Sequence, residues 1–128
     1  MSNFEWTTLL GSNEPEEGHA LTIGADGSIY IAGHTWGDLD RQTNNGGYGD
    51  AFLTKFNPNG TKEWTRLLGT SDSDRGRALT TGSDGSIYIA GYTEGDLDGQ
   101  TNNGGYDDAF LTKFNPNGTK EWTRLLGT

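Results

Sequence analysis

The sequence contains no cysteine and no valine, only three prolines, and half as many basic residues as acidic ones, 9 against 18. Without cysteine, disulfides and thiolate metal sites are excluded. The formal net charge of −9 argues against nucleic acid and anionic membrane surfaces, because both attract basic patches. Cations or other proteins are the more natural partners.

Long hydrophobic runs are also missing. No stretch is long enough to span a bilayer, and the first residues lack the basic segment and apolar run of a signal peptide. We therefore expect a soluble chain without an export signal, whose compartment the sequence does not identify. Hydrophobic residues make up 30% of the chain while glycine reaches 21 residues, which predicts many turns around a thin core.

A 58-residue repeat organises the chain. Residues 5–62 align with residues 63–120 without a gap, and fourteen of the 58 positions differ. A third copy begins and stops, because residues 121–128 repeat residues 63–70 without a change. A fixed period of this length is typical of repeat architectures. Such near-identity indicates recent amplification or deliberate construction, and an engineered or excised fragment of this kind would have assembly as its purpose.

Turn residues divide each copy into four short β-type runs, and no segment shows the 3.6-residue apolar period of a helix. The predicted strands are residues 20–24, 28–35, 51–56 and 61–68 in the first copy and 78–82, 86–93, 109–114 and 119–126 in the second. Asp26-Gly27 has the composition of a two-residue hairpin turn, and Asn57-Pro58-Asn59-Gly60 that of a tight turn with glycine where the chain reverses.

The second predicted strand carries apolar groups on both faces. Ile29 and Ile31 point one way, whereas Tyr30 and Ala32 point the other, so both faces should be covered. Four consecutive antiparallel strands with both faces covered, followed by a link to the next four, describe a propeller blade. We therefore predict an all-β fold of two β-propeller blades, each a four-stranded antiparallel sheet.

Residues 50–93, DAFLTKFNPNGTKEWTRLLGTSDSDRGRALTTGSDGSIYIAGYT, carry a resemblance to a known family. The hairpin DAFLTKFNPNG, the LG followed by an acidic link, and the strand pair DGSIYIAG resemble the repeat of bacterial SBBP-type β-propellers, and the likeness extends over essentially the whole chain. This resemblance implies that residues 20–24 and 78–82 form the innermost strands and that the tryptophan-bearing runs form the outermost ones. It implies little about function, because propellers serve many.

The repeat predicts three parts: an extra outer strand in residues 1–12, a first blade in 13–70 whose last strand is 61–69, and a second blade in 71–128 whose last strand is 119–127. Two blades cannot close a ring, because propellers need about four to eight. We therefore expect a cyclic homo-oligomer of six blades from three chains or eight from four, with four chains favoured. Residues 5–11 and 121–127 then compete for one outer position.

A long polar loop in each copy, residues 37–50 and 95–108, is the candidate for cation binding. Carboxylate and amide oxygens suit a hard cation such as calcium. The candidate ligands are Asp38, Asp40, Asn44, Asp50, Asp96, Asp98, Asn102, Asp107 and Asp108. The sixth position of a calcium loop should be glycine but is Thr101 here. The alternative is that turn-forming Asp, Asn and Gly residues build a compact connection.

Other candidates carry less weight. The acidic link Ser71-Asp72-Ser73-Asp74 has a counterpart, residues 13–16, that breaks its spacing. His19 and His34 occur in the first copy alone, without a Ser or Cys in a recognisable catalytic setting, and we interpret them as surface or groove substitutions. Trp36 is either a platform for a sugar or peptide or a local packing residue.

The sequence therefore favours a structural, self-assembling β-propeller protein with no catalytic activity and no cofactor. The alternative is a calcium- or glycan-binding module that uses the long Asp/Asn/Gly loops.

Overall fold

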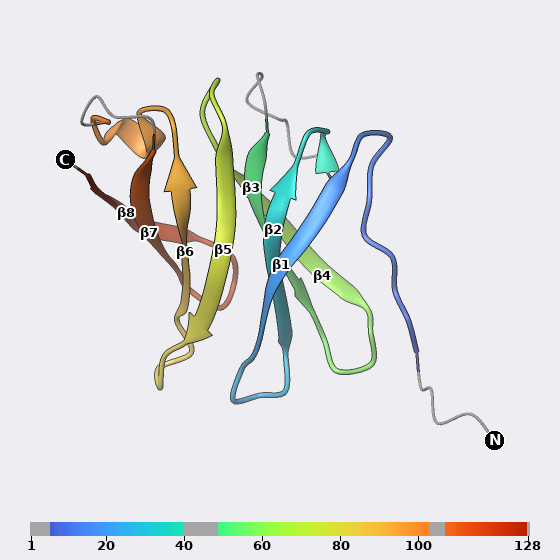
Figure 1. Cartoon of the computed structure of the whole chain (residues 1–128). Coiled ribbons are helices and arrows are strands. Elements are labelled where there is room, and N and C mark those ends of the chain that lie inside the picture. Colours follow the sequence, from blue (N-terminus) through green and yellow to red (C-terminus); the bar gives the residue numbers. More distant parts are fainter. Residues whose placement is uncertain (1–5, 40–48, 103–106, 128) are drawn as a thin grey trace.

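The computed structural model of the chain describes residues 6–39, 49–102 and 107–127 and contains two four-stranded antiparallel sheets (Figure 1). The first sheet consists of β1 (Glu16–Ile23), β2 (Ile29–Thr35), β3 (Asp50–Phe56) and β4 (Lys62–Leu68). The second consists of β5 (Asp74–Thr81), β6 (Ile87–Thr93), β7 (Asp108–Phe114) and β8 (Lys120–Leu126). In both sheets the spatial order of the strands follows the chain, as in a propeller blade. We call the sheets blade 1 and blade 2.

The predicted all-β fold with two four-stranded sheets is confirmed, whereas the predicted start of each first strand is wrong. Strand β1 begins at Glu16 and β5 at Asp74, four residues before the predicted starts. A β-bulge between Gly18 and Ala20 in blade 1, and at the matching place in blade 2, allows the polar beginning of each strand to keep pairing. A bulge breaks the two-residue alternation, so this part of the strand carries no strand-like pattern in the sequence.

The tight turns form as the sequence predicts. In blade 1 the Asn57 amide donates to the Thr61 carbonyl over 2.9 Å, and Gly60 has a φ of 91°. The Asp26 side chain accepts a hydrogen bond from the Ser28 amide, and this bond lowers the pKa of Asp26. A short 3-10 turn, η2 (Leu97–Gly99), follows β6 and places Leu97 in the core.

The core lies between the two blades. Blade 1 contributes Tyr30, Ala32, Ala51, Leu53 and Leu68, and blade 2 contributes Ile87, Ile89, Leu97, Phe110 and Phe114. Within a blade, side chains alternate between the two faces of the sheet. One face of blade 1 therefore packs against the opposite face of blade 2, and the fold is built around this junction.

The two sheets fan apart from their first strands. Strands β1 and β5 lie side by side, while β4 and β8 lie towards the outside of the pair (Figure 1). This arrangement matches the expectation that the first strands are innermost and the tryptophan-bearing strands outermost.

The described part of the N-terminal segment, residues 6–12, forms no strand. The outer position of blade 2 is taken by β8, and that of blade 1 by β4. Residues 6–12 instead pack against the face of blade 1 that blade 2 does not cover, where Trp6 and Thr8 lie beside Leu21, Ile29, Ile31 and Phe56.

Candidate functional site: the two open blade faces

The repeat places identical residues in different surroundings. Leu53 in blade 1 is 1% exposed, whereas its repeat partner Leu111 in blade 2 is 39% exposed. Leu68 is 3% exposed and its partner Leu126 is 78% exposed. Blade 2 covers this face of blade 1, and no third blade covers the same face of blade 2. We call the uncovered surface the open face of blade 2.

Blade 1 is open on its opposite face. Ile89 of blade 2 is 1% exposed at the junction, whereas the matching Ile31 is partly exposed. On β1, Leu21 and Ile23 are 64% and 55% exposed. A shallow apolar groove on this face is lined by Trp6, Thr8, Leu21, Ile29, Ile31 and Phe56. We call this surface the open face of blade 1.

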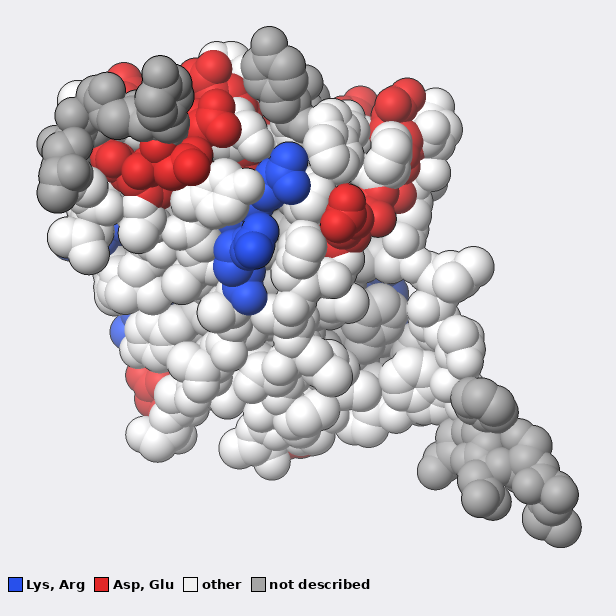
Figure 2. All heavy atoms as spheres, viewed as in Figure 1, with Lys and Arg blue, Asp and Glu red and all other residues white. Residues whose placement is uncertain are grey.

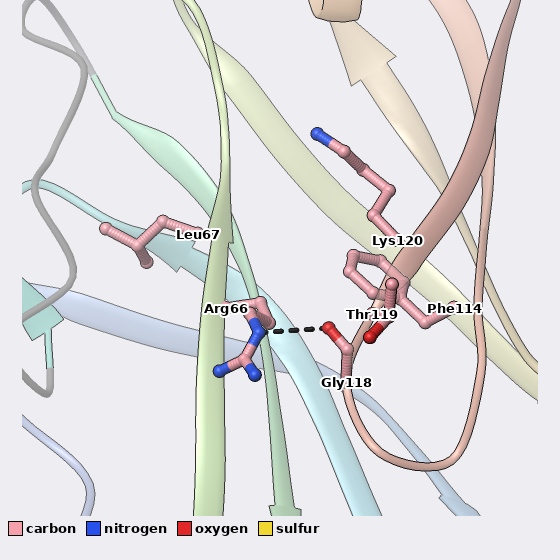
Figure 3. Close-up of a pocket in the computed structure, with 6 residues that line it drawn as sticks. All are labelled: Arg66, Leu67, Phe114, Gly118, Thr119 and Lys120. Carbon is pink, nitrogen blue, oxygen red and sulfur yellow. Dashed lines mark hydrogen bonds between the residues drawn. The ribbon is translucent and has the colours of Figure 1, made fainter.

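Among the polar contacts between the blades, two cross from blade 1 to the β7–β8 turn. The Thr81 hydroxyl and the Asp74 amide make others, to the carbonyls of Ile23 and Gly49. Lys55 Nζ donates to the Pro116 carbonyl over 3.2 Å. Arg66 Nε donates to the Gly118 carbonyl over 2.9 Å, beside a pocket whose wall includes Phe114 (Figure 3). Because a charged donor meets a backbone oxygen in each case, both contacts fix the relative position of the blades.

The open face of blade 2 presents the same two cations in the same poses. Lys55 lies 5.8 Å from the Tyr30 ring centre, and Lys113 lies 6.0 Å from that of Tyr88. Arg124 lies 5.4 Å from the Trp122 ring centre, matching the 5.3 Å between Arg66 and its tryptophan. The open face of blade 2 is therefore already arranged as the junction is.

The N-terminal segment occupies the place of a preceding blade's outer strand. The Thr8 hydroxyl donates to the Gly60 carbonyl over 3.3 Å, as Arg66, 58 positions later, donates to Gly118. A Cβ built on Gly60 would lie 2.9 Å from Trp6 Cδ2. Built on Gly118, it would lie 3.1 Å from the same atom of Trp64. Residues 6–12 thus contact blade 1 as β4 contacts blade 2.

The short links before β1 and β5, residues 12–16 and 70–74, make matching hydrogen bonds in the two blades. The Ser12 amide donates to the Glu16 carboxylate over 2.9 Å, and the Thr70 amide donates to the Asp74 carboxylate over 2.7 Å. Each carboxylate also accepts a hydrogen bond from a threonine at the end of the second strand, Thr35 in blade 1 and Thr93 in blade 2. The acidic link therefore joins one blade to the next.

The two link carboxylates have opposite electrostatics. Burial raises the pKa of Asp74 to about 6 against the lowering effect of its bonds to Thr93 and Thr70, and the charge of Asp50 raises it further. Burial also raises the pKa of Glu16, but the hydrogen bonds from Ser12 and Thr35 together outweigh it and the net pKa is lowered. The carboxylate on the covered side is thus the one that resists ionisation.

The loop residues predicted to bind calcium are dispersed in the described part of the chain. Asp98 accepts hydrogen bonds from Lys120 and Thr123, which fasten η2 to β8. Asp96 accepts a 2.7 Å bond from the Asn102 amide. Asp50 and Asp108 are buried at the starts of β3 and β7, whereas Asp38 and Asp107 are exposed. Asp40 and Asn44 lie outside the described residues, and calcium binding stays a prediction.

A third group of titratable side chains was missed in the sequence. Glu17, His19 and His34 come together at the bulge of β1, with His19 Nε2 and His34 Nδ1 3.1 Å apart and their rings stacked 5.0 Å between centres. Burial lowers the pKa of His34, as do the positive charges of Arg75, His19 and Arg77, while Glu17 opposes the shift. The available signal was that both histidines depart from the repeat, His19 directly before the first predicted strand and His34 within the second.

Charge is unevenly distributed over the surface. In the view of Figure 2, acidic side chains gather at the end where the β2–β3 and β6–β7 connections lie, and a short basic strip runs over β5. Strand β5 carries Arg75 and Arg77, while the matching positions of β1 are Glu17 and His19. The charge on the innermost strand thus changes sign between the blades.

Comparison with known proteins agrees with the architecture. Residues 63–98 match SBBP, the β-propeller repeat family. The chain is 30% identical over 132 aligned positions to the regulatory protein FlaEY of Caulobacter vibrioides, an alignment that covers 93% of this chain and 14% of that protein. The chain thus spans about a seventh of its relative's length.

Within the described ranges, no helix has the length and apolar character needed to cross a membrane.

Proposed function

We propose that this chain, which carries an SBBP β-propeller repeat, is a structural two-blade unit that assembles head to tail with copies of itself into a closed ring. The observation that carries the proposal is the pair of open faces. They are the two halves of the junction between blades 1 and 2, separated to opposite ends of one chain. A surface that fits the far end of its own copy gives a heterologous interface, which closes into a ring when the rotation allows.

The occupant of each open face is therefore a second copy of this chain. When blade 2 of one copy packs on blade 1 of the next, Leu111 and Leu126 take the buried places that Leu53 and Leu68 hold within a chain. Each large apolar side chain buried in this way contributes about 1.5–3 kcal/mol. The junction within the chain supports this fit, because both copies of the repeat have leucine at these positions.

The polar contacts extend the same argument. In the assembly we expect Lys113 to donate to the Pro58 carbonyl of the next copy, and Arg124 to donate to its Gly60 carbonyl. Lys113 and Arg124 are the repeat partners of Lys55 and Arg66. The expected bonds therefore repeat, between copies, the two bonds that Lys55 and Arg66 donate to the β7–β8 turn within one chain. Both donors hold their poses over aromatic rings before any partner arrives, so little side-chain entropy is lost on docking.

The N-terminal segment competes with this docking. Residues 6–12 rest where β8 of an incoming copy would lie, so one of the two must yield. Either the segment is displaced, or it crosses to pair with β7 of the neighbouring copy as its outer strand. In a ring of n chains there are twice n outer positions and three candidate segments per chain, so one segment per chain is surplus.

The number of chains follows from whole blades. Two blades per chain permit six blades from three chains or eight from four, within the range of about four to eight that propellers adopt. We favour four chains. A ring with an odd number of blades cannot be built from whole chains.

Native mass measurement and light scattering at micromolar concentration test the proposal. The expected result is a single closed species of three or four chains. Leu111→Asp, on the open face of blade 2, should give a folded monomer, whereas Thr101→Asp, in the exposed part of the polar loop, should leave the ring intact. A folded wild-type monomer at this concentration would contradict the proposal.

Truncation tests the competition between outer strands. Removing residues 1–11 or residues 121–128 alone should leave the ring intact, because the other segment can fill the outer position. Removing both should strip one outer strand from every second blade and destabilise the ring. If removal of residues 121–128 abolishes assembly while removal of residues 1–11 does not, the two segments are not interchangeable, and the proposed crossing of residues 6–12 to a neighbouring copy is wrong.

A further inference from the structure

The cluster of Glu17, His19 and His34 lies on β1 and β2 of blade 1, so all three of its residues come from one chain. The histidines face one another across β1 and β2, with His19 Nε2 3.1 Å from His34 Nδ1. One carboxylate oxygen of Glu17 lies 3.8 Å from His19 Nε2, and the other lies 3.7 Å from His34 Nε2. One ligand atom from each residue falls within 4.8 Å of the other two.

The backbone creates this meeting. In the regular register Glu17 lies opposite His34, and the β-bulge between Gly18 and Ala20 inserts His19 as an extra residue. The bulge brings His19 Nε2 to 3.1 Å from His34 Nδ1, with an angle of 18° between the two ring planes. Bulges commonly re-aim a side chain next to a functional site.

We propose that Glu17, His19 and His34 bind one divalent transition-metal ion of the zinc class. His19 Nε2 and His34 Nδ1 serve as nitrogen ligands and one Glu17 oxygen as the third, with the remaining position open to water. Zinc–nitrogen bonds of about 2.0–2.1 Å in a tetrahedral site place two nitrogens about 3.3 Å apart, close to the separation seen here.

The environment of His34 supports this assignment. Its side chain is fully buried, and within the described residues its Nε2 atom makes no hydrogen bond. Metal bound at Nδ1 leaves the proton on Nε2, directed at the second Glu17 oxygen 3.7 Å away. A carboxylate in this position orients many metal-bound histidines. The edge of the Trp36 ring packs on His34 at 4.8 Å between centres and holds its plane.

The neighbouring charges decide the class of metal. Arg75 and Arg77 act electrostatically on His34, and Glu17 is the opposing charge. A hard cation held by charge alone is disfavoured beside two arginines. Neutral imidazole instead donates a lone pair, which suits zinc, copper and nickel more than calcium or magnesium.

Blade 2 provides an internal reference. The same bulge occurs between Gly76 and Ala78, but the residues matching the cluster are Arg75, Arg77 and Tyr92. Arg77 lies over the Tyr92 ring at 5.8 Å, and these three positions contain neither a histidine nor a carboxylate. The expected stoichiometry is therefore one metal ion per chain and not two.

Calorimetric titration of the chelator-treated chain with zinc chloride tests the proposal. The expected result is one zinc per chain and a higher melting temperature, because a ligand that binds the folded state stabilises it. The double variant Glu17→Gln/His19→Gln changes two partly exposed side chains and should weaken zinc binding more than tenfold. Glu14→Gln, an exposed change in the same region, is the matched control and should bind zinc as the parent does.

Cobalt gives a second readout that does not depend on stability. Co²⁺ bound by two imidazoles and a carboxylate should show visible absorption bands in the parent chain, and zinc should displace them. Retained zinc affinity and cobalt bands in the folded double variant would overturn the proposal, as would the absence of binding by the parent. Oligomerisation need not occur for this experiment, so its outcome is separate from that of the ring.

Discussion

Blade 1 and blade 2 are the same sheet in two neighbourhoods. Strand β3 is repeated letter for letter in β7, and β4 in β8, yet Leu53 and Leu68 are buried where Leu111 and Leu126 are exposed. Because the local sequence is identical, this difference in burial comes from the adjacent blade alone. The comparison teaches that a blade forms from its own sequence, whereas its burial depends on what packs beside it.

The largest expected effect is at the junction. Ile89→Asp should prevent folding, because it places an unpaired carboxylate between two blades at a cost of several kcal/mol. Ile31→Asp is the same change on the open face of blade 1 and should leave a folded monomer that no longer assembles. Circular dichroism and light scattering on both variants provide the measurement. Equal loss of folding in the two would show that the two faces are not in different environments.

Leucine truncation sharpens the comparison at intermediate energies. Leu68→Ala removes a buried side chain and should destabilise the chain by about 2–5 kcal/mol. Leu126→Ala should change monomer stability by less than about 0.5 kcal/mol, since the side chain is exposed. Thermal unfolding at rising protein concentration should reveal the loss at Leu126 as the assembly forms. A large loss of stability in Leu126→Ala at every protein concentration would contradict the conclusion that this side chain lies on an uncovered face.

The link carboxylates should give opposite pH dependences. The folded-state pKa of Asp74 is about 6, above the usual 3.8, so its contribution to stability is full below about pH 4 and is lost as pH rises to about 6. A difference of about two pKa units between the folded and unfolded states corresponds to a loss of about 3 kcal/mol in the free energy of unfolding. The lowered pKa of Glu16 acts in the other direction, since its contribution is present above the unfolded pKa and lost on acidification.

Urea unfolding from about pH 3 to pH 7 measures both slopes, because the Glu16 contribution is lost below its ordinary pKa of 4.5. Asp74→Asn should remove the fall in stability across this range, even though it also loses an acceptor for the Thr70 amide. Glu16→Gln should instead reduce the loss on acidification. Parallel slopes in the two variants would show that blade 2 does not bury its link carboxylate more than blade 1 does.

The smallest effect concerns the polar contacts. Arg66→Ala should cost about 1.5–3 kcal/mol, because it removes a charged hydrogen bond to the Gly118 carbonyl. Arg124→Ala should be close to neutral in the monomer and should weaken association between copies. Chemical unfolding of dilute protein and sedimentation of concentrated protein separate the two effects. If Arg124→Ala destabilised the dilute protein as much as Arg66→Ala does, the expected difference between the two arginines would be contradicted.

The candidate sites show where sequence reasoning stopped. The open faces were predicted in principle, because two blades with apolar residues on both faces leave two faces without a neighbour. The N-terminal segment was predicted to compete for an outer position, and the structure places residues 6–12 where an outer strand of a preceding blade would lie. The histidine cluster was missed, because His19 and His34 are fifteen positions apart and meet through a bulge that alternation rules do not show.

The sequence by itself determined the repeat, the four strands of each blade and the turns between them, because turn chemistry and two-residue alternation act over a few neighbouring residues. Only the tertiary structure decided that Leu53 and Leu68 are buried while Leu111 and Leu126 are exposed, how the link carboxylates differ and where the two histidines meet. These properties depend on contacts between residues far apart in the chain. Two identical segments must share their local structure, but they need not share their neighbours.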